Sequence, residues 1–118
     1  MKNRPFHQRL GFAINGLAAA WRRENSFRTQ AAVAALTVIV LALLRPALVW
    51  WAIVGLSIFF VLTMELLNSA FEALIDHLHP DRHPEIRVIK DMAAAAVLLA
   101  SIAALLIGCL FIWTLLSA

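Results

Sequence analysis

The stretch ALVWWAIVGLSIFFVLTM, residues 47–64, contains no charged side chain and is followed directly by ELLNSAFEALID, residues 65–76. The first part has the composition of a membrane-spanning helix, and the second carries three carboxylates and an amide. On a helix, Glu65 and the residues three, seven and eleven positions later share one narrow stripe, because each residue turns about 100°. Those residues are Asn68, Glu72 and Asp76. Charged groups this close to a bilayer are costly, so the stripe predicts a functional site.

The composition indicates a membrane protein of one domain. The chain has 118 residues, of which 63% are hydrophobic and only 14% are charged. A soluble chain of this size would expose much of that apolar surface to water. Near the ends of the apolar runs, where a membrane interface favours tryptophan, lie Trp21, Trp50, Trp51 and Trp113.

Hydropathy divides the single membrane domain, residues 1–118, into a surface helix and three spans. Residues 1–28 are basic and carry apolar residues at helical spacing, which predicts an amphipathic helix on the membrane surface. The polar segment 77–90 contains two prolines and predicts a loop or an interfacial segment. Helices that contain the membrane spans are predicted at 29–48, 49–76 and 91–116. The expected fold class is therefore all-α integral membrane.

The distribution of lysine and arginine predicts the orientation. The N-terminal segment and residues 77–90 hold nine of the ten basic residues, and Arg45 alone lies in the expected turn before Pro46. The positive-inside rule then places the N-terminus and the 77–90 loop in the cytoplasm and the C-terminus outside. Because the rest of the chain is lipid-like, the basic segment is expected to meet anionic membrane lipids and not nucleic acid.

The polar groups expected at the cytoplasmic interface are rich in carboxylates. Besides the stripe, they include Glu24, Asp81, Lys90 and Asp91. Mg²⁺ accepts carboxylate oxygens together with substrate phosphates, a further carboxylate can take a proton from a hydroxyl, and a lysine can neutralise phosphate charge. Together these groups favour phosphoryl transfer to a lipid hydroxyl.

One observation keeps another class of protein open at this point, and a second disfavours a transition-metal site. The sequence has no glycine-rich phosphate-binding loop, so a non-catalytic ion-binding or structural membrane protein stays as an alternative. The histidines His77, His79 and His83 do not favour a transition-metal site, because the His-x-His spacing does not place both rings on one helix face.

Three segments resemble the small integral-membrane diacylglycerol kinases of bacteria. They are ELLNSAFEALID at 65–76, IKDMAAAAVLL at 89–99 and GLAAAWRRENSFR at 16–28. The likeness runs without a gap over nearly the whole chain. It implies a homotrimer of three-helix subunits in the bacterial inner membrane, with a cytoplasmic N-terminus and a periplasmic C-terminus. It also implies transfer of the γ-phosphate of MgATP to a lipid hydroxyl.

The resemblance assigns roles to individual residues. Glu65 looks like the general base, and Asn68 matches a polar residue that supports the catalytic centre. Glu24 and Glu72 look like carboxylates that bind Mg²⁺ and touch the ATP. Further nucleotide contacts are implied for Phe12, Asp81, Arg82, His83, Lys90 and Asp91. Contacts with the lipid substrate are implied for Trp21, Phe27, Arg28 and Glu65.

Four positions differ from the best-known enterobacterial pattern. Pro5 stands where an arginine near the nucleotide is expected, and Phe12 replaces a tyrosine and keeps only its ring. Ala13 replaces a serine, and Gln30 replaces a glutamate. These differences leave the phosphate chemistry in place and bear on how nucleotide and lipid are recognised.

The expected reaction converts ATP and diacylglycerol to ADP and phosphatidic acid. Undecaprenol is the alternative acceptor within the same fold. A small non-catalytic membrane subunit is the alternative of a different class.

Overall fold

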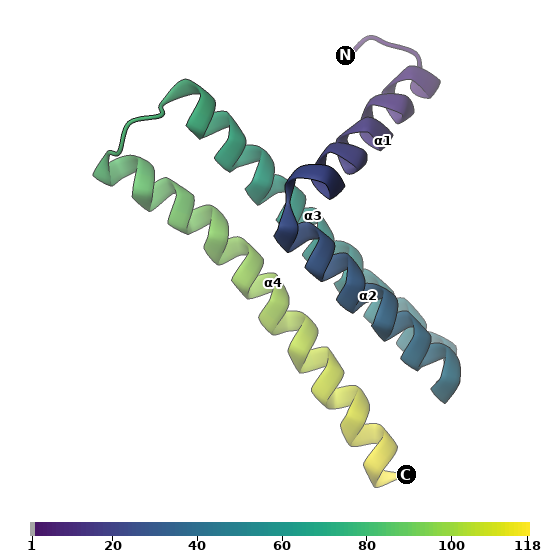
Figure 1. Ribbon diagram of the computed structural model, residues 1–118. Coiled ribbons are helices and arrows are strands. Elements are labelled where there is room, and N and C mark those ends of the chain that lie inside the picture. The colour runs from purple at the N-terminus through teal and green to yellow at the C-terminus, as the bar shows by residue number, and fades with distance from the viewer. Residues whose placement is uncertain (1) are drawn as a thin grey trace.

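The computed structural model describes residues 2–118, which form four helices joined by short connections (Figure 1). They are α1 Phe6–Arg23, α2 Asn25–Leu44, α3 Leu48–Leu78 and α4 Pro84–Ser117. Helix is the only regular secondary structure in the described residues. The prediction of an all-helical chain is therefore confirmed.

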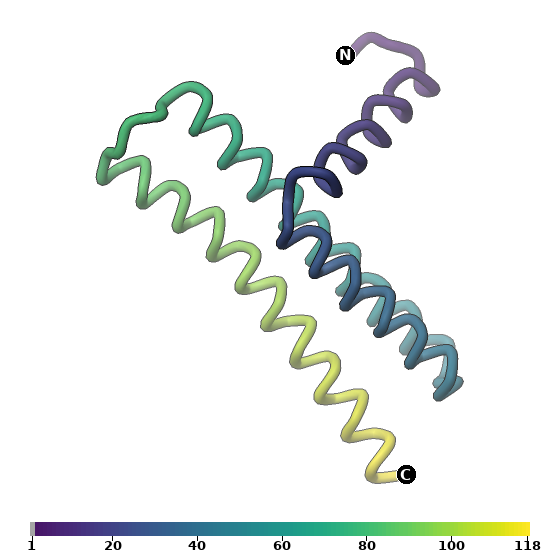
Figure 2. Tube along the Cα trace, in the orientation of Figure 1, coloured from purple at the N-terminus to yellow at the C-terminus, as the bar shows by residue number. Residues whose placement is uncertain are grey.

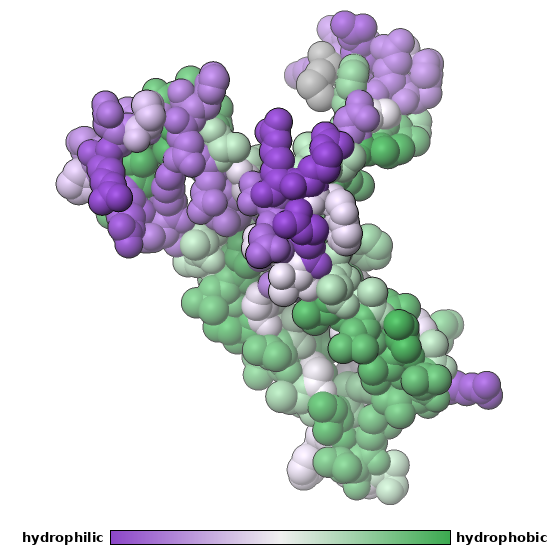
Figure 3. All heavy atoms as spheres, in the orientation of Figure 1, coloured by the Kyte–Doolittle hydropathy of each residue, from purple (hydrophilic) through white to green (hydrophobic). Residues whose placement is uncertain are grey.

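Three of these helices, α2, α3 and α4, are long and apolar enough to cross a membrane. With a rise of ~1.5 Å per residue, the 20 residues of α2 cover about 30 Å, the hydrocarbon thickness of a typical bilayer. The 31 residues of α3 and the 34 residues of α4 exceed that length, so both helices continue past the hydrocarbon region. Figure 3 shows the resulting division: polar side chains gather over α1, at the α1–α2 bend and around the α3–α4 connection, and most of the remainder is apolar.

α1 leaves the other helices at a sharp bend at Glu24. The backbone there is extended (φ −110°, ψ 107°), so α1 and α2 run in different directions (Figures 1 and 2). Arg28 stabilises the bend, because its guanidinium donates to the carbonyl oxygens of Trp21 at 2.6 Å and Arg22 at 3.2 Å. These are carbonyls that the end of a helix leaves without intrahelical partners. The bend makes Asn25 the first residue of α2, four positions before the predicted start.

α2 ends at Leu44 because Pro46 disfavours helical backbone at the residue before it. Arg45 accordingly adopts a left-handed conformation with φ 51°, and its N–H donates to the Leu41 carbonyl at 2.9 Å. This bond closes the last turn of the helix. The turn at Arg45 and Pro46 is present as predicted, and α2 lies four residues earlier than the predicted segment 29–48.

The connection between α3 and α4 is shorter than the predicted loop. The 77–90 segment is non-helical only at 79–83, because α3 continues past residue 76 and α4 begins at Pro84. Pro84 occupies the first turn of α4, where its missing N–H costs no hydrogen bond. The His83 side chain caps this helix by accepting from the backbone N–H two residues later, at 3.1 Å. The prediction of a loop up to residue 90 is wrong, because a proline that starts a helix resembles one in a loop.

The buried core is small and lies toward the α2–α3 turn. Leu41, Val54 and Phe111 form its centre, one from each long helix, and the Trp50 ring packs on the Phe111 ring with centroids 5.1 Å apart. Most other large apolar side chains of the three helices are exposed in the single chain. Such a surface suits lipid or further protein in place of water.

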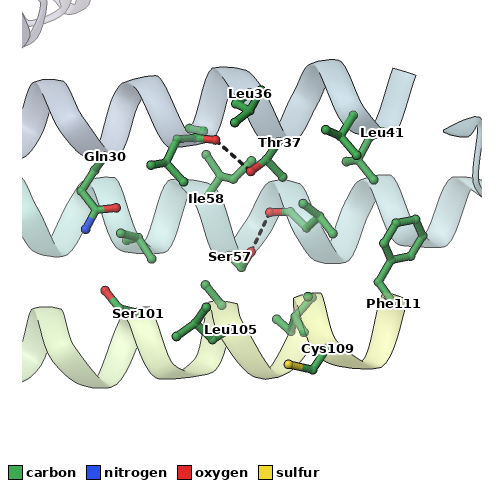
Figure 4. A pocket seen from close by; sticks show the side chains of 18 of the residues that line it. Gln30, Leu36, Thr37, Leu41, Ser57, Ile58, Ser101, Leu105, Cys109 and Phe111 are labelled. Carbon is green, nitrogen blue, oxygen red and sulfur yellow. Dashed lines mark hydrogen bonds between the residues drawn. The ribbon is translucent and has the colours of Figure 1, made fainter. Parts of the chain in front are cut away.

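An apolar groove runs along the inner faces of the three long helices. Its volume is about 560 Å³, and Figure 4 shows Gln30 at one end and Phe111 at the other. The hydroxyls of Thr37 and Ser57 do not add polarity to its lining, because each donates to a carbonyl of its own helix at 2.8 Å. The groove therefore presents hydrocarbon along most of its length and an amide at one end.

Candidate active site

Glu65 is the only buried charged side chain among residues 2–118, with 5% of its surface exposed. It lies on α3 at the point where the apolar run ends, and two side chains of α2 donate to it. The Ser26 hydroxyl lies 3.2 Å from Oε2, and the Gln30 amide nitrogen lies 3.5 Å from Oε1. Both donors are neutral, so protein dipoles solvate the carboxylate, and no cationic side chain of the described residues donates to it. Hydrogen-bond donors of this kind offset part of the cost of burying a carboxylate.

The rest of the stripe becomes progressively more exposed along α3. Asn68, one turn after Glu65, has a buried side-chain oxygen that accepts no hydrogen bond within the described residues. Glu72 is half-buried, and Asp76 is exposed. Because ~1.5 Å separates successive residues, Glu72 lies about 10.5 Å beyond Glu65 along the axis. The stripe thus runs from a protected carboxylate to a solvent-accessible one.

Lys90 of α4 contacts the same stripe. Its ammonium group is hydrogen-bonded and ion-paired to the Asp76 carboxylate, although the two residues are fourteen positions apart in the chain. Asp91, the next residue, instead pairs with Arg87 one turn earlier on α4 at 3.5 Å. That second pair is highly exposed, so it contributes little to stability. The two neighbouring predicted nucleotide residues therefore face different partners.

The bend between α1 and α2 holds the predicted lipid-contacting residues. Glu24 is half-buried at the bend itself, and Trp21 is exposed on the last turn of α1. The Phe27 side chain is buried, with 7% of its surface exposed. The Arg28 guanidinium is occupied by the carbonyls at the end of α1 and by the Asn25 side chain at 3.3 Å. In the single chain, the Arg28 side chain thus stabilises the bend, and Phe27 is buried near the start of α2.

The remaining predicted nucleotide residues lie on α1 and on the α3–α4 connection. Phe12 is exposed on α1 and lines a small hollow together with Lys2 and Arg9. Asp81, Arg82 and His83 are exposed in the 79–83 connection. The His83 and His79 rings lie edge to face with their centroids 6.2 Å apart. No hydrogen bond or ion pair among residues 2–118 joins either group to the stripe.

The carboxylates do not form a closed metal cage in the single chain. Within residues 2–118, no three His, Cys, Asp or Glu side chains lie close enough together to hold a metal ion. Mg²⁺ does not require such a cage, because it usually takes one or two carboxylates and completes its shell with phosphate oxygens and water. Half-buried Glu72 on the stripe and half-buried Glu24 at the bend are donors of that kind.

Sequence reasoning missed the two residues that contact Glu65. Ser26 and Gln30 are four positions apart near the start of α2, a spacing that places two side chains on one helix face. This spacing at the polar end of an apolar helix was a usable signal for a polar face. It did not say which carboxylate that face meets, because the contact depends on how α2 packs against α3.

Residues 11–112 match the sequence profile of the family described as prokaryotic diacylglycerol kinase, and every predicted site residue lies within that range. The chain belongs to this family. The resemblance carried by the three sequence segments is confirmed.

Several named relatives align with most of the chain. The diacylglycerol kinase of Escherichia coli strain K12 is 34% identical over 104 residues, which cover 88% of this chain and 85% of the relative. The diacylglycerol kinase of Helicobacter pylori strain 26695 is 32% identical over 106 residues, or 90% of this chain and 76% of the relative. The undecaprenol kinase of Bacillus subtilis strain 168 is 31% identical over 105 residues, or 89% and 85%.

Proposed function

We propose that this chain is an ATP-dependent diacylglycerol kinase that converts ATP and diacylglycerol to ADP and phosphatidic acid. The observation that carries the proposal is the buried Glu65 carboxylate, placed where the apolar part of α3 meets its polar part, in a chain of this family. Three helices fit to cross a membrane and bacterial relatives make the chain a bacterial membrane protein. A lipid acceptor and a membrane-embedded base therefore meet at the same depth.

The reaction needs one proton transfer and one phosphoryl transfer. Glu65 takes the proton of the acceptor hydroxyl while the hydroxyl oxygen bonds to the γ-phosphorus and the bond to the β–γ bridging oxygen breaks, which releases ADP. Glu65 suits this role because it is the carboxylate of the stripe that lies nearest the apolar span. The free oxygen of Asn68, one turn away, offers an acceptor for a donor that arrives with the substrates.

We assign Mg²⁺ to Glu72 and Glu24, which bring hard oxygen donors from α3 and from the α1–α2 bend. When bound, Mg²⁺ would neutralise charge on the phosphates of ATP. The residues of the chain then divide the work by position. Glu72 lies toward the solvent-accessible end of the stripe, where the nucleotide arrives, and Glu65 lies at the lipid end.

The ATP contacts are proposed along the same end of the molecule. Lys90 supplies positive charge beside the stripe, and Asp91 follows it on α4. From the α3–α4 connection and from α1 we add Asp81, Arg82, His83 and Phe12. Trp21, Phe27 and Arg28, at the end of α1 and the start of α2, are proposed to lie beside the lipid substrate. α1 itself is then an amphipathic helix at the membrane surface.

A homotrimer with the N-terminus in the cytoplasm and the C-terminus in the periplasm completes the proposal. Two observations support shared sites. Much apolar surface of the long helices is exposed in the single chain, and within residues 2–118 neither Glu24 nor Glu72 belongs to a group of three possible metal ligands. In a trimer, Glu24 of one subunit can approach Glu65 and Glu72 of another. The charges at membrane depth would then be enclosed by protein.

The acceptor is the point at which relatives divide. The B. subtilis relative is named an undecaprenol kinase, and its identity to this chain is close to that of the E. coli diacylglycerol kinase. An assay with the purified full chain, γ-labelled ATP and either diacylglycerol or undecaprenol in mixed micelles tests the choice. We expect label in phosphatidic acid, and at least about a hundredfold less with Glu65→Gln as the matched control. A preference for undecaprenol would make undecaprenol the acceptor in place of diacylglycerol. No labelled lipid at all would favour a non-catalytic subunit.

A further inference from the structure

We propose that Ser26 and Gln30 are positioning residues that form a fork on α2 and orient the Glu65 carboxylate for proton transfer. The inference rests on the proposed role of Glu65 as the base. The fork consists of the Ser26 hydroxyl, the Gln30 amide and the two carboxylate oxygens between them.

The geometry assigns one donor to each oxygen. Ser26 and Gln30 are one turn apart on α2, and their bonds to Oε2 and Oε1 measure 3.2 Å and 3.5 Å. A carboxylate oxygen has two lone-pair sites, so one donor on each leaves a site free on each. The fork can therefore fix the plane of the carboxylate without occupying the lone pair that takes the proton. The shorter hydrogen bond makes the Ser26 hydroxyl the stronger of the two donors.

The chemistry of the donors matters as much as their position. A lysine or arginine against a buried carboxylate would hold it as an ion pair and weaken it as a base. Ser26 and Gln30 carry no charge, and they are the only hydrogen-bond donors to Glu65 in the described residues. They donate to the buried carboxylate and hold it in place without pairing it with a cation.

The fork also fixes α2 relative to α3 at the level of the reaction. Ser26 follows Glu24 by two residues, so the same stretch of chain carries a proposed metal ligand and holds the proposed base. Gln30 lies at the end of the apolar groove, where an amide replaces hydrocarbon (Figure 4). Loss of the fork should therefore misplace the base and leave nucleotide binding intact.

The test compares Ser26→Ala, Gln30→Met and the double variant with wild-type protein in micelles. Gln30→Met keeps the length of the side chain and removes the donor. We expect kcat to fall about tenfold in each single variant and about a hundredfold in the double variant, the size of loss that slight misplacement of a reacting group produces. The KM for MgATP should stay within about twofold, since Glu65 is not proposed to hold the nucleotide.

Two further variants separate positioning from simple packing. Ser26→Thr keeps the hydroxyl and should restore most of the lost kcat. Thr29→Ala is the matched control, because the Thr29 hydroxyl bonds only to the Asn25 carbonyl of its own helix at 3.1 Å, and it should leave kcat unchanged. Gln30→Met carries the test on its own if Ser26→Ala does not assemble.

The outcomes also separate this inference from the proposed function. Wild-type protein that phosphorylates no lipid would overturn the proposed function itself. Active wild-type protein with unchanged kcat in Ser26→Ala and Gln30→Met would overturn the fork alone. Equal losses in kcat and in MgATP affinity would also overturn it, because they indicate general damage to the site.

Discussion

The Lys90 ammonium lies against the Asp76 carboxylate and joins α4 to α3 across the short connection between them. Asp76 is four residues after Glu72, so the pair holds the lysine one helical turn from the proposed metal ligand. The lysine side chain is 30% exposed and the aspartate 62%, which leaves the pair accessible to solvent. Such a pair contributes little to folding stability, and its main effect is to place a positive charge beside the stripe.

Replacing the partner of Lys90 should therefore weaken nucleotide binding. With Asp76→Asn, the lysine loses its anchor, and the KM for MgATP should rise about three- to tenfold, which corresponds to ~1 kcal/mol for an accessible charge pair. The kcat should change less, because Glu65 is untouched. Steady-state kinetics at varied MgATP measure both values. The control is Glu85→Gln, which removes another exposed carboxylate, on the first turn of α4. An equal effect of that substitution on the KM would refute a specific role for Asp76.

Glu65 and Glu72 should fail in different ways. Glu65→Gln keeps the shape of the side chain, but an amide nitrogen replaces one of the two accepting oxygens and the group cannot take a proton. The kcat should therefore fall about 10²- to 10⁴-fold, with little change in MgATP affinity. Glu72→Gln should instead weaken MgATP binding and raise the Mg²⁺ concentration needed for activity. Kinetics of both variants over a range of Mg²⁺ concentrations distinguish the roles. The same Mg²⁺ defect in both variants would contradict the division.

Shared sites predict complementation between inactive chains. If Glu24 of one subunit works with Glu65 of another, mixtures of Glu24→Gln and Glu65→Gln chains should contain some sites with both native residues. Unfolding, mixing and refolding the two variants together should then recover part of the wild-type activity. The control is each variant taken through the same treatment alone. Mixed assemblies that form and stay inactive would show that each site uses one chain.

The orientation can be tested by accessibility in intact cells. In a Cys109→Ser background, single cysteines at Asn3 and Pro80 should resist an impermeant thiol reagent, and one at Ala118 should react. Pro80 is chosen because it lies in the exposed α3–α4 connection and outside both helices. Permeabilised cells provide the control, in which all three positions should react. Labelling of the Asn3 position from outside would reverse the orientation and separate the site from cytoplasmic ATP.

The sequence predicted the helices better than their ends. Apolar runs define α2, α3 and the membrane part of α4, because a bilayer-spanning helix needs about twenty such residues whatever its partners are. Pro84 misled the prediction, since the same residue can end a loop or begin a helix, and only the cap from His83 decides. The extension of α4 then brings Lys90 to Asp76, a contact that a longer loop would have concealed.

Within the candidate site, the stripe on α3 was predictable and its neighbours on other helices were not. Glu65, Asn68 and Glu72 share a face because of helical geometry alone. The contacts of Glu65 with Ser26 and Gln30 depend on the rotation and depth of α2 against α3, which no spacing along the chain specifies. The position of Glu24 likewise depends on the bend between α1 and α2, which the basic amphipathic pattern of residues 1–28 does not predict.

The brief connections between the helices have a consequence for how the protein is made. One residue separates α1 from α2, three separate α2 from α3, and five separate α3 from α4, and each helix packs on the one that precedes it. The most extensive contacts within the chain therefore join helices that follow one another, and the core adds a contact between α2 and α4 through Leu41 and Phe111. During synthesis each helix can pack on its predecessor as soon as the next segment emerges, and the core is completed only when Phe111 of α4 joins Leu41 and Val54. In the proposed homotrimer, the concentration-dependent step of biogenesis is the association of folded subunits.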